Sequence, residues 1–85
     1  MARLIDGADK NMVGHNVRKF RLKKGMSQKQ LSDGLELMAI YVCRGSISRI
    51  EDKQRTVTDI ELYGIARVLG VSIAELYSES TPEHF

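Results

Sequence analysis

Residues 46–51, SISRIE, and the upstream residues 27–31, SQKQL, decide the fold that this chain is expected to adopt. In the first stretch Ile47 and Ile50 are spaced to share one side of a short helix, where they can pack into a core. The other side carries hydroxyl and guanidinium groups, which can donate hydrogen bonds to base edges and phosphates. In the second stretch the Ser-x-x-Gln pattern is a capping box that starts a helix. Two such helices in succession predict a helix-turn-helix, whose second helix reads DNA.

The composition is that of one small globular domain. Of the 85 residues, 42% are hydrophobic, which is ordinary for a folded chain. A single cysteine excludes an internal disulfide and a cysteine-rich zinc site. The sequence has no apolar run of about 18 residues and no signal-peptide pattern. We therefore expect a cytoplasmic protein with no membrane-spanning segment.

The charges are distributed unevenly along the chain. The first 30 residues contain eight basic and two acidic residues, whereas residues 56–85 contain one basic and five acidic residues. The net charge of the whole chain is only +2. A polyanion would orient such a molecule with its basic end inward. The asymmetry therefore favours a nucleic-acid partner, although solvated basic helices are also common in small domains.

Apolar periodicity predicts five helices and no strand. The first covers about residues 12–24, where apolar residues recur at intervals of four and three from Val13 and face a core. Either Asp9 or Asn11 is expected to cap its start. Gly25 follows the last two lysines and can adopt the left-handed conformation that ends a helix. Both ends of this helix are thus marked in the sequence.

The connection between the two helices of the expected motif is unusually long. The second helix covers about residues 28–38 and the third about residues 44–52, whereas the motif usually has a turn of about three or four residues. The extra residues either lengthen the second helix by a turn or form a loop beside the DNA backbone. In an extended link, Ile40 and Val42 would tuck beneath the domain.

Two further capping boxes mark the last two helices. Thr58 and Glu61 open a fourth helix that Gly70 stops, and Ser72 and Glu75 open a short fifth helix. The fourth helix is apolar over more than half of its circumference, which predicts the central core helix. Its apolar residues are Ile60, Leu62, Ile65, Ala66, Val68 and Leu69.

The order of these motifs carries a family resemblance. The Ser-Gln…Leu run from Ser27, the Ile-Ser-Arg-Ile-Glu run from Ile47 and the Leu-Gly-Val-Ser run from Leu69 follow one another over about residues 12–77. In this order they resemble the Cro/repressor-type (xenobiotic response element) helix-turn-helix family. The resemblance implies an all-α, five-helix lambda-repressor-like DNA-binding domain containing a helix-turn-helix with a lengthened turn. The chain then divides into an N-terminal arm (1–10), a helix-turn-helix domain (11–78) and a C-terminal tail (79–85).

The resemblance also implies which residues contact DNA. Residues 44–50 would form the recognition helix in the major groove. Gln28, at the start of the second helix, would contact a phosphate with help from the helix dipole. Lys53 and Arg55, in the loop after the third helix, are further candidates for phosphate contacts. The expected DNA-binding residues are Gln28, Arg44, Gly45, Ser46, Ser48, Arg49, Lys53 and Arg55.

Two other positions match or depart from the family pattern. Arg21 and Glu51 match an internal arginine–glutamate pair, which would tie the first helix to the end of the third and play a structural role. Lys53 stands where the family often has glycine, so the loop after the third helix is expected to differ.

Other reactive side chains give weaker signals. Cys43 lies beside Arg44 near the start of the third helix, a setting that lowers a thiol pKa. It could therefore act as a redox switch, or it could simply be a half-buried apolar filler. His15 and His84 have no metal-ligand spacing. No catalytic set and no phosphate-cradling loop is evident. We therefore expect no enzyme activity, metal, cofactor or small-molecule ligand.

These features predict a transcriptional regulator that binds specific sequences of double-stranded DNA and represses transcription by occupying an operator. One recognition helix reads few base pairs, so we expect a homodimer on two half-sites. Leu76 and Tyr77 of the fifth helix, or Leu4 and Ile5 near the N-terminus, are candidates for its interface. The alternative is a protein-interaction module on the same fold, such as an antitoxin or a partner-binding regulator.

Overall fold

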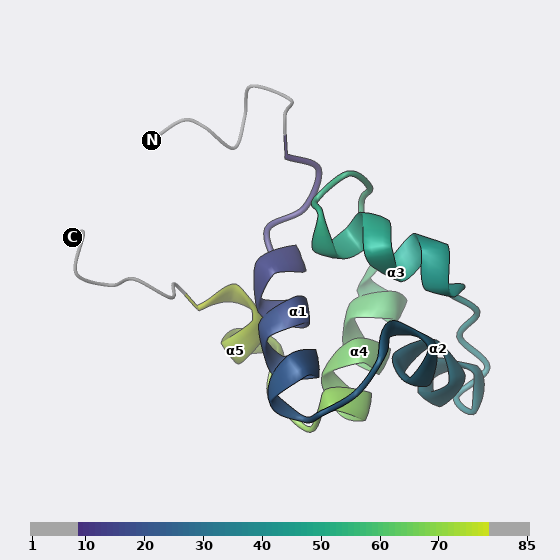
Figure 1. The fold of residues 1–85 in the computed structure, drawn as a ribbon. Coiled ribbons are helices and arrows are strands. Elements are labelled where there is room, and N and C mark those ends of the chain that lie inside the picture. The colour runs from purple at the N-terminus through teal and green to yellow at the C-terminus, as the bar shows by residue number, and fades with distance from the viewer. Residues whose placement is uncertain (1–8, 79–85) are drawn as a thin grey trace.

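A computed structural model describes residues 9–78 of the chain, and these residues form five α-helices and no strand (Figure 1). The all-α fold expected from the sequence is confirmed. Residues 1–8 of the expected N-terminal arm, including Leu4 and Ile5, lie outside the described residues, as do the expected tail and His84. The helices are α1 (Gly14–Lys23), α2 (Gln28–Glu36), α3 (Arg44–Glu51), α4 (Asp59–Leu69) and α5 (Ile73–Tyr77).

The helices surround a single apolar core. α3 packs against α1 and α2, and α4 packs against α1, α2 and α5. In Figure 1, α3 crosses above the other helices and α5 lies beside α1. Because α3 rests on its two neighbours by one side only, its other side faces away from the core. The buried core residues are Val13, Val17, Leu31, Leu35, Val42, Ile47, Ile50, Ile65, Ala66, Leu69 and Leu76.

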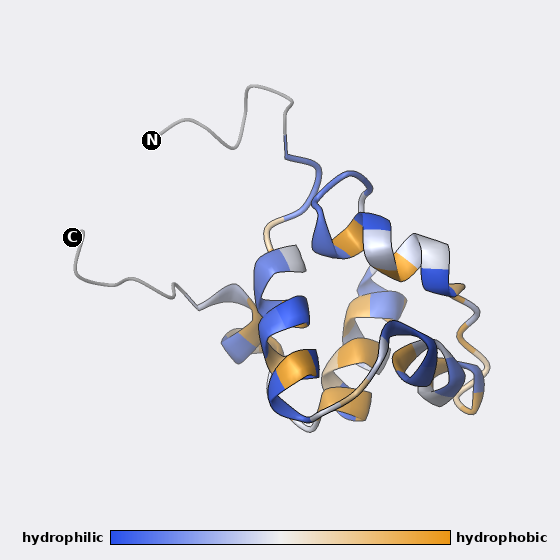
Figure 2. Ribbon diagram, in the orientation of Figure 1, coloured by the Kyte–Doolittle hydropathy of each residue, from blue (hydrophilic) through white to orange (hydrophobic). Residues whose placement is uncertain are grey.

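The helix expected to be central, α4, is the most apolar of the four longer helices. Its ribbon is mainly orange in Figure 2, whereas that of α1 is mainly blue. Ile65 and Leu69 are buried as expected. Ile60 is not part of the core, because it lies in the first turn of α4 and its side chain is 65% exposed. In α5, Leu76 is fully buried, so the expectation that it forms a dimer interface is wrong; Tyr77 remains about half exposed.

The start of α1 differs from the expected cap. The N-cap residue is Val13, not Asp9 or Asn11. The Asn11 side chain nevertheless does part of the capping, because its Oδ1 accepts hydrogen bonds from the amides of Val13 (3.1 Å) and Gly14 (2.8 Å). The free amides of a helix start are thus satisfied from two residues before the N-cap position.

Each of the helices α1 to α4 is followed, within one to three residues of its last helical residue, by a residue with positive φ. Gly25 and Gly70 have φ of 72° and 73°, and Ala39 and Lys53 both have φ of 61°. At each end the following amide donates back across the last turn, as from Ile40 to the Leu35 carbonyl at 3.0 Å, which is the Schellman pattern. Glycine adopts this conformation freely, whereas alanine and lysine are strained in it. Two of the four turns therefore close at some cost in stability.

The long link between α2 and α3 is a turn followed by an extended segment. α2 ends at Glu36 rather than near Met38, so the alternative in which the link lengthens the helix is wrong. Residues 40–43 then run extended to the start of α3. Val42 is buried, and Ile40 packs on Gly64, where a Cβ atom would lie 2.6 Å from Ile40 Cδ1. The two apolar side chains thus fix the link to the core, as expected for an extended link.

Candidate nucleic-acid interface

The two sides of α3 have opposite characters. Ile47 and Ile50 are fully buried against α1 and α2. The opposite side is open to solvent, because α1 and α2, the helices that make the main contacts with α3, pack on the side that carries Ile47 and Ile50. Of the expected DNA-binding residues on α3, Arg44, Gly45 and Arg49 are exposed, and Ser46 and Ser48 are partly exposed. The structure therefore brings these five residues together on one accessible surface, which we call the α3 outer side.

Hydrogen bonds organise part of the α3 outer side. Arg49 Nη2 donates to Ser46 Oγ at 3.1 Å, and Cys43 Sγ lies 3.5 Å from the same oxygen. The Arg49 guanidinium lies next to Gly45, since a Cβ atom there would be 3.9 Å from Nη1, an ordinary van der Waals distance. The Arg49 side chain thus lies along the helix toward its N-terminus, with its charged group in solvent.

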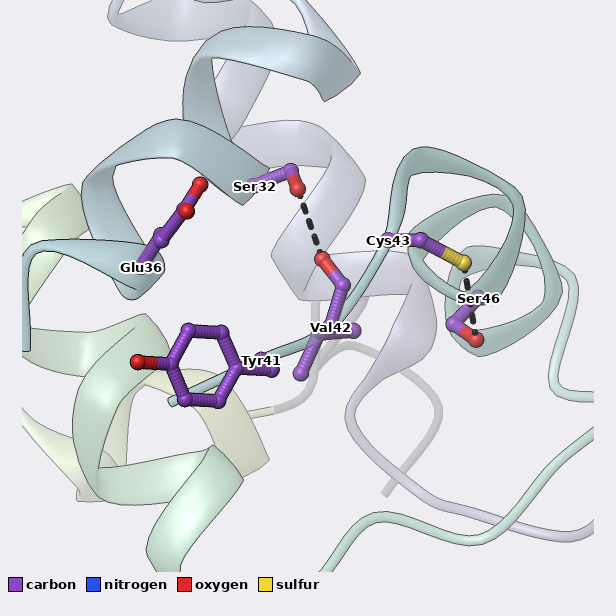
Figure 3. Close-up of a pocket in the computed structure, with 6 residues that line it drawn as sticks. All are labelled: Ser32, Glu36, Tyr41, Val42, Cys43 and Ser46. Carbon is purple, nitrogen blue, oxygen red and sulfur yellow. Dashed lines mark hydrogen bonds between the residues drawn. The ribbon is translucent and has the colours of Figure 1, made fainter. Parts of the chain in front are cut away.

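Cys43 is the N-cap residue of α3, and it is exposed rather than a half-buried apolar filler. The side-chain and backbone hydrogen bonds with Ser46 lower the pKa of the Cys43 thiol, with a smaller contribution from the Arg49 charge. The thiol adjoins a shallow hollow of about 360 Å³ between α2, the link and α3 (Figure 3). Across this hollow, Ser32 Oγ donates to the Val42 carbonyl at 2.7 Å and ties the link to α2.

A buried ion pair holds the C-terminal end of α3, as the resemblance implied. Arg21 Nε donates to Glu51 Oε2 at 2.6 Å and Arg21 Nη2 to Oε1 at 3.0 Å, with side-chain exposures of 8% and 1%. Arg21 Nη1 also donates to the Met26 carbonyl, and Gln28 Nε2 donates to Glu51 Oε1 at 3.1 Å. This network ties α3 to α1 and to the start of α2. The Gln28 side chain belongs to it, which the sequence did not indicate.

The two cations of the loop after α3 are in different situations. Arg55 forms a two-pronged ion pair with Glu61, with nitrogen–oxygen distances of 3.0 and 2.9 Å. This pairing raises the pKa of Arg55 and lowers that of Glu61, although the partial burial of each group opposes the shift. Lys53 Nζ lies 4.0 Å from Asp9 Oδ2 in a loose, partly exposed contact. The charge of Arg55 is therefore largely balanced within the protein, and that of Lys53 less so.

Sequence reasoning missed two residues that hold the end of α3. Asn11 Nδ2 donates to the carbonyls of Ile50 (3.0 Å) and Arg55 (2.8 Å). Gly14 lies so close to α3 that a Cβ atom would sit 2.1 Å from the Ile50 carbonyl oxygen. These contacts join residues about 40 positions apart, so no local sequence pattern predicts them. The available signal was Gly14, a glycine at the start of an otherwise regular helix.

Two negative findings concern other kinds of site. Within residues 9–78, no group of three or more His, Cys, Asp or Glu side chains is placed to hold a metal ion. Over the same described range, no helix is both long and apolar enough to cross a bilayer.

Comparison with known proteins identifies the family. A family model described as helix-turn-helix matches residues 17–76, which include α2, the link, α3 and α4. The chain belongs to this helix-turn-helix family, the Cro/repressor type that the sequence resembled. It is a family of DNA-binding regulators. No match to the chain was found among curated proteins.

Proposed function

We propose that the protein is a transcriptional regulator that binds specific double-stranded DNA and represses by occupying its operator. The observation that carries this proposal is the contrast across α3, whose inner side is fixed in the core while its outer side presents donors to solvent. A helix of this size fits the major groove, where guanidinium and hydroxyl groups distinguish base pairs by their edges.

The proposed contacts fall into two classes. Arg44, Ser46, Ser48 and Arg49 lie on the α3 outer side and contact base edges or the flanking phosphates, while Gly45 lets the helix approach the DNA closely. Gln28 lies at the start of α2 and Lys53 after the end of α3, where they contact phosphates on either side of the groove. Gln28 uses its second Nε2 hydrogen for this contact, since the first is donated to Glu51. Arg55 contributes little, because Glu61 already balances its charge.

The protein acts as a homodimer in this proposal. A single α3 reads only a few base pairs, so adequate specificity needs a second copy on a symmetrical half-site. Tyr77, together with the exposed Ile73 and Met12, supplies apolar surface for contact with the second copy. The protein works in the cytoplasm without enzyme activity or a cofactor, because occupancy of DNA requires neither.

The experiment is a selection of bound sequences from a random duplex pool, followed by fluorescence titration of the selected duplex. The expected site is a near-palindrome whose half-sites are about 34–36 Å apart. Affinity should fall steeply with salt, with a slope in log–log form of about −0.9 per phosphate contact. A folded sample that enriches no sequence, or whose binding does not depend on salt, would refute the proposal and favour a protein-interaction module.

A further inference from the structure

The side chain of Asn11 joins three segments of the chain at once. Its Oδ1 accepts from the amides of Val13 and Gly14 at the start of α1. Its Nδ2 donates to the carbonyl of Ile50 in the last turn of α3, at 3.0 Å, and to that of Arg55 in the following loop, at 2.8 Å. A primary amide has two donor hydrogens and an oxygen that accepts two hydrogen bonds. Asn11 therefore uses its full hydrogen-bonding capacity to connect these segments.

Neighbouring contacts make this connection close and rigid. The Lys10 amide donates to the Lys53 carbonyl at 3.0 Å, so the backbone before α1 runs beside the loop after α3. At Gly14, a Cβ atom would lie 2.1 Å from the Ile50 carbonyl and 3.1 Å from that of Glu51. Main chain thus packs directly on main chain at this end of α3, and no side chain separates the two.

The groups held by Asn11 adjoin proposed DNA contacts. Ile50 follows Arg49 directly, and Lys53 lies between the two carbonyls that Asn11 binds. The Arg21–Glu51 pair fixes how deeply the end of α3 is seated, but it does not reach the loop. Within residues 9–78, Asn11 is the one residue whose side chain hydrogen-bonds to the last turn of α3, the loop and the start of α1.

We propose that Asn11 is a positioning residue for DNA recognition: its amide fixes the end of α3 and the Lys53 loop in the orientation that fits the groove. This inference rests on the proposed function. Loss of the amide would leave the core intact but allow the last turn of α3 and the loop to shift. Displacement of base-reading groups weakens binding to the correct sequence, while general attraction to phosphates persists.

The chain contains a matched control in Asn16. This side chain also donates two hydrogen bonds from Nδ2 to main-chain carbonyls, those of Leu76 (2.9 Å) and Ser78 (2.7 Å). It is more deeply buried than Asn11 and holds the end of α5 rather than that of α3. Asn16→Ala therefore removes two donated bonds to main-chain carbonyls, as Asn11→Ala does at α3, but from a place that does not adjoin the α3 outer side.

The test compares Asn11→Ala and Asn16→Ala with the wild type by titration of the selected duplex and of a scrambled duplex. Salt is fixed, and the temperature is one at which circular dichroism shows each protein to be folded. We expect Asn11→Ala to bind the selected duplex about tenfold more weakly, which is the effect of losing the two bonds to the Ile50 and Arg55 carbonyls. Its affinity for the scrambled duplex should change less than about twofold. Asn16→Ala should lower the melting temperature but keep the wild-type ratio of the two affinities.

Each other outcome counts against a specific claim. If the wild type prefers the selected duplex and Asn11→Ala retains that preference, the positioning role is wrong and the proposed function stands. If the wild type binds both duplexes equally, the proposed function fails and the inference with it. Should Asn11→Ala not fold, Asn11→Ser takes its place, because a hydroxyl can still accept from the start of α1 without reaching α3. Failure of that variant to fold would show a purely structural role and overturn the inference.

Discussion

The inner and outer sides of α3 use the same chemical groups for different purposes. On the inner side the Arg21 guanidinium is paired with Glu51 at 2.6 Å in a nearly solvent-free setting. On the outer side the Arg49 guanidinium makes a single hydrogen bond to Ser46 among the contacts described and remains in solvent. The ion pair holds the Arg21 guanidinium in one position, whereas the exposed Arg49 guanidinium can exchange Ser46 for another hydrogen-bond partner. Surroundings, and not residue type, therefore separate the structural arginine from the one proposed for recognition.

The largest effect is expected on the inner side. Glu51→Ala leaves the Arg21 charge buried without its partner, which costs about 3–5 kcal/mol of unfolding free energy. That is a large share of the total stability of a small domain. Urea denaturation at neutral pH measures the loss, with Asp52→Ala as the control at an exposed neighbouring carboxylate. A midpoint equal to that of the wild type would show that the pair does not stabilise the fold.

On the outer side the effect should appear in binding and not in folding. Arg49→Ala is expected to weaken binding of the selected duplex by about 1–3 kcal/mol. Its unfolding free energy should stay within about 0.5 kcal/mol of the wild type, since the side chain is exposed. Fluorescence titration at fixed salt and a thermal melt measure the two quantities. Unchanged affinity would remove Arg49 from the recognition surface and weaken the contrast between the two sides.

Lys53 has a positive φ in the turn after α3 and is also proposed to contact a phosphate, so its replacement should affect both stability and DNA binding. Lysine in the left-handed conformation is strained by about 1–2 kcal/mol, and Lys53→Gly removes that strain. Glycine also raises the entropy of the unfolded chain, which lowers the stability of the fold by about 0.5–1 kcal/mol. A net gain of about 0.5–1 kcal/mol is therefore expected, together with a salt slope smaller by about 1.

Ala39→Gly is the control for Lys53→Gly, because Ala39 has the same φ of 61° at the end of α2 and carries no charge. It should give a similar gain in stability and an unchanged salt slope. If both variants flatten the salt dependence equally, the phosphate contact assigned to Lys53 is wrong.

The smallest effect concerns the Arg55–Glu61 pair, which is intermediate between the two sides in burial. Its guanidinium holds the pKa of Glu61 below the ordinary value of 4.5. The ionised carboxylate therefore stabilises the fold at pH values above 4.5, and this contribution is lost as the pH falls through the lowered pKa. Because the pair is partly solvated, the loss should not exceed about 1 kcal/mol. Melting temperatures of the wild type and Glu61→Gln should converge as the pH falls from 6 toward 3; a constant difference would contradict this.

Features set by neighbouring residues could be predicted from the sequence. The capping boxes at Ser27, Thr58 and Ser72 form as expected, because each needs only residues three positions apart. The helix ends at Gly25 and Gly70 also form as expected, since glycine favours the left-handed conformation. The Arg21–Glu51 pair followed from the family resemblance.

Features set by distant parts of the chain could not be predicted. The left-handed turns at Ala39 and Lys53 run against the preference of those residues, and packing of the link and the loop imposes them. The bonds from Asn11 to α3 and its loop depend on how the helices are arranged. The pairing of Arg55 with Glu61, six residues apart, depends on the path of the loop into α4. The exposed outer side of α3 followed from the spacing of Ile47 and Ile50, whereas the contacts proposed for it depend on the DNA.

The attachment of the α2–α3 link has a practical consequence for altering the protein. Ile40 packs on Gly64 and the Val42 carbonyl accepts a hydrogen bond from Ser32, so the chain between Ile40 and Val42 must span a fixed distance. Deleting one residue there would draw Arg44 back by about 3.3 Å along an extended backbone. Leu37, in contrast, lies outside both attachments and is 91% exposed. It is a suitable site for a fluorescent dye, whose signal could report duplex engagement without altering the fold.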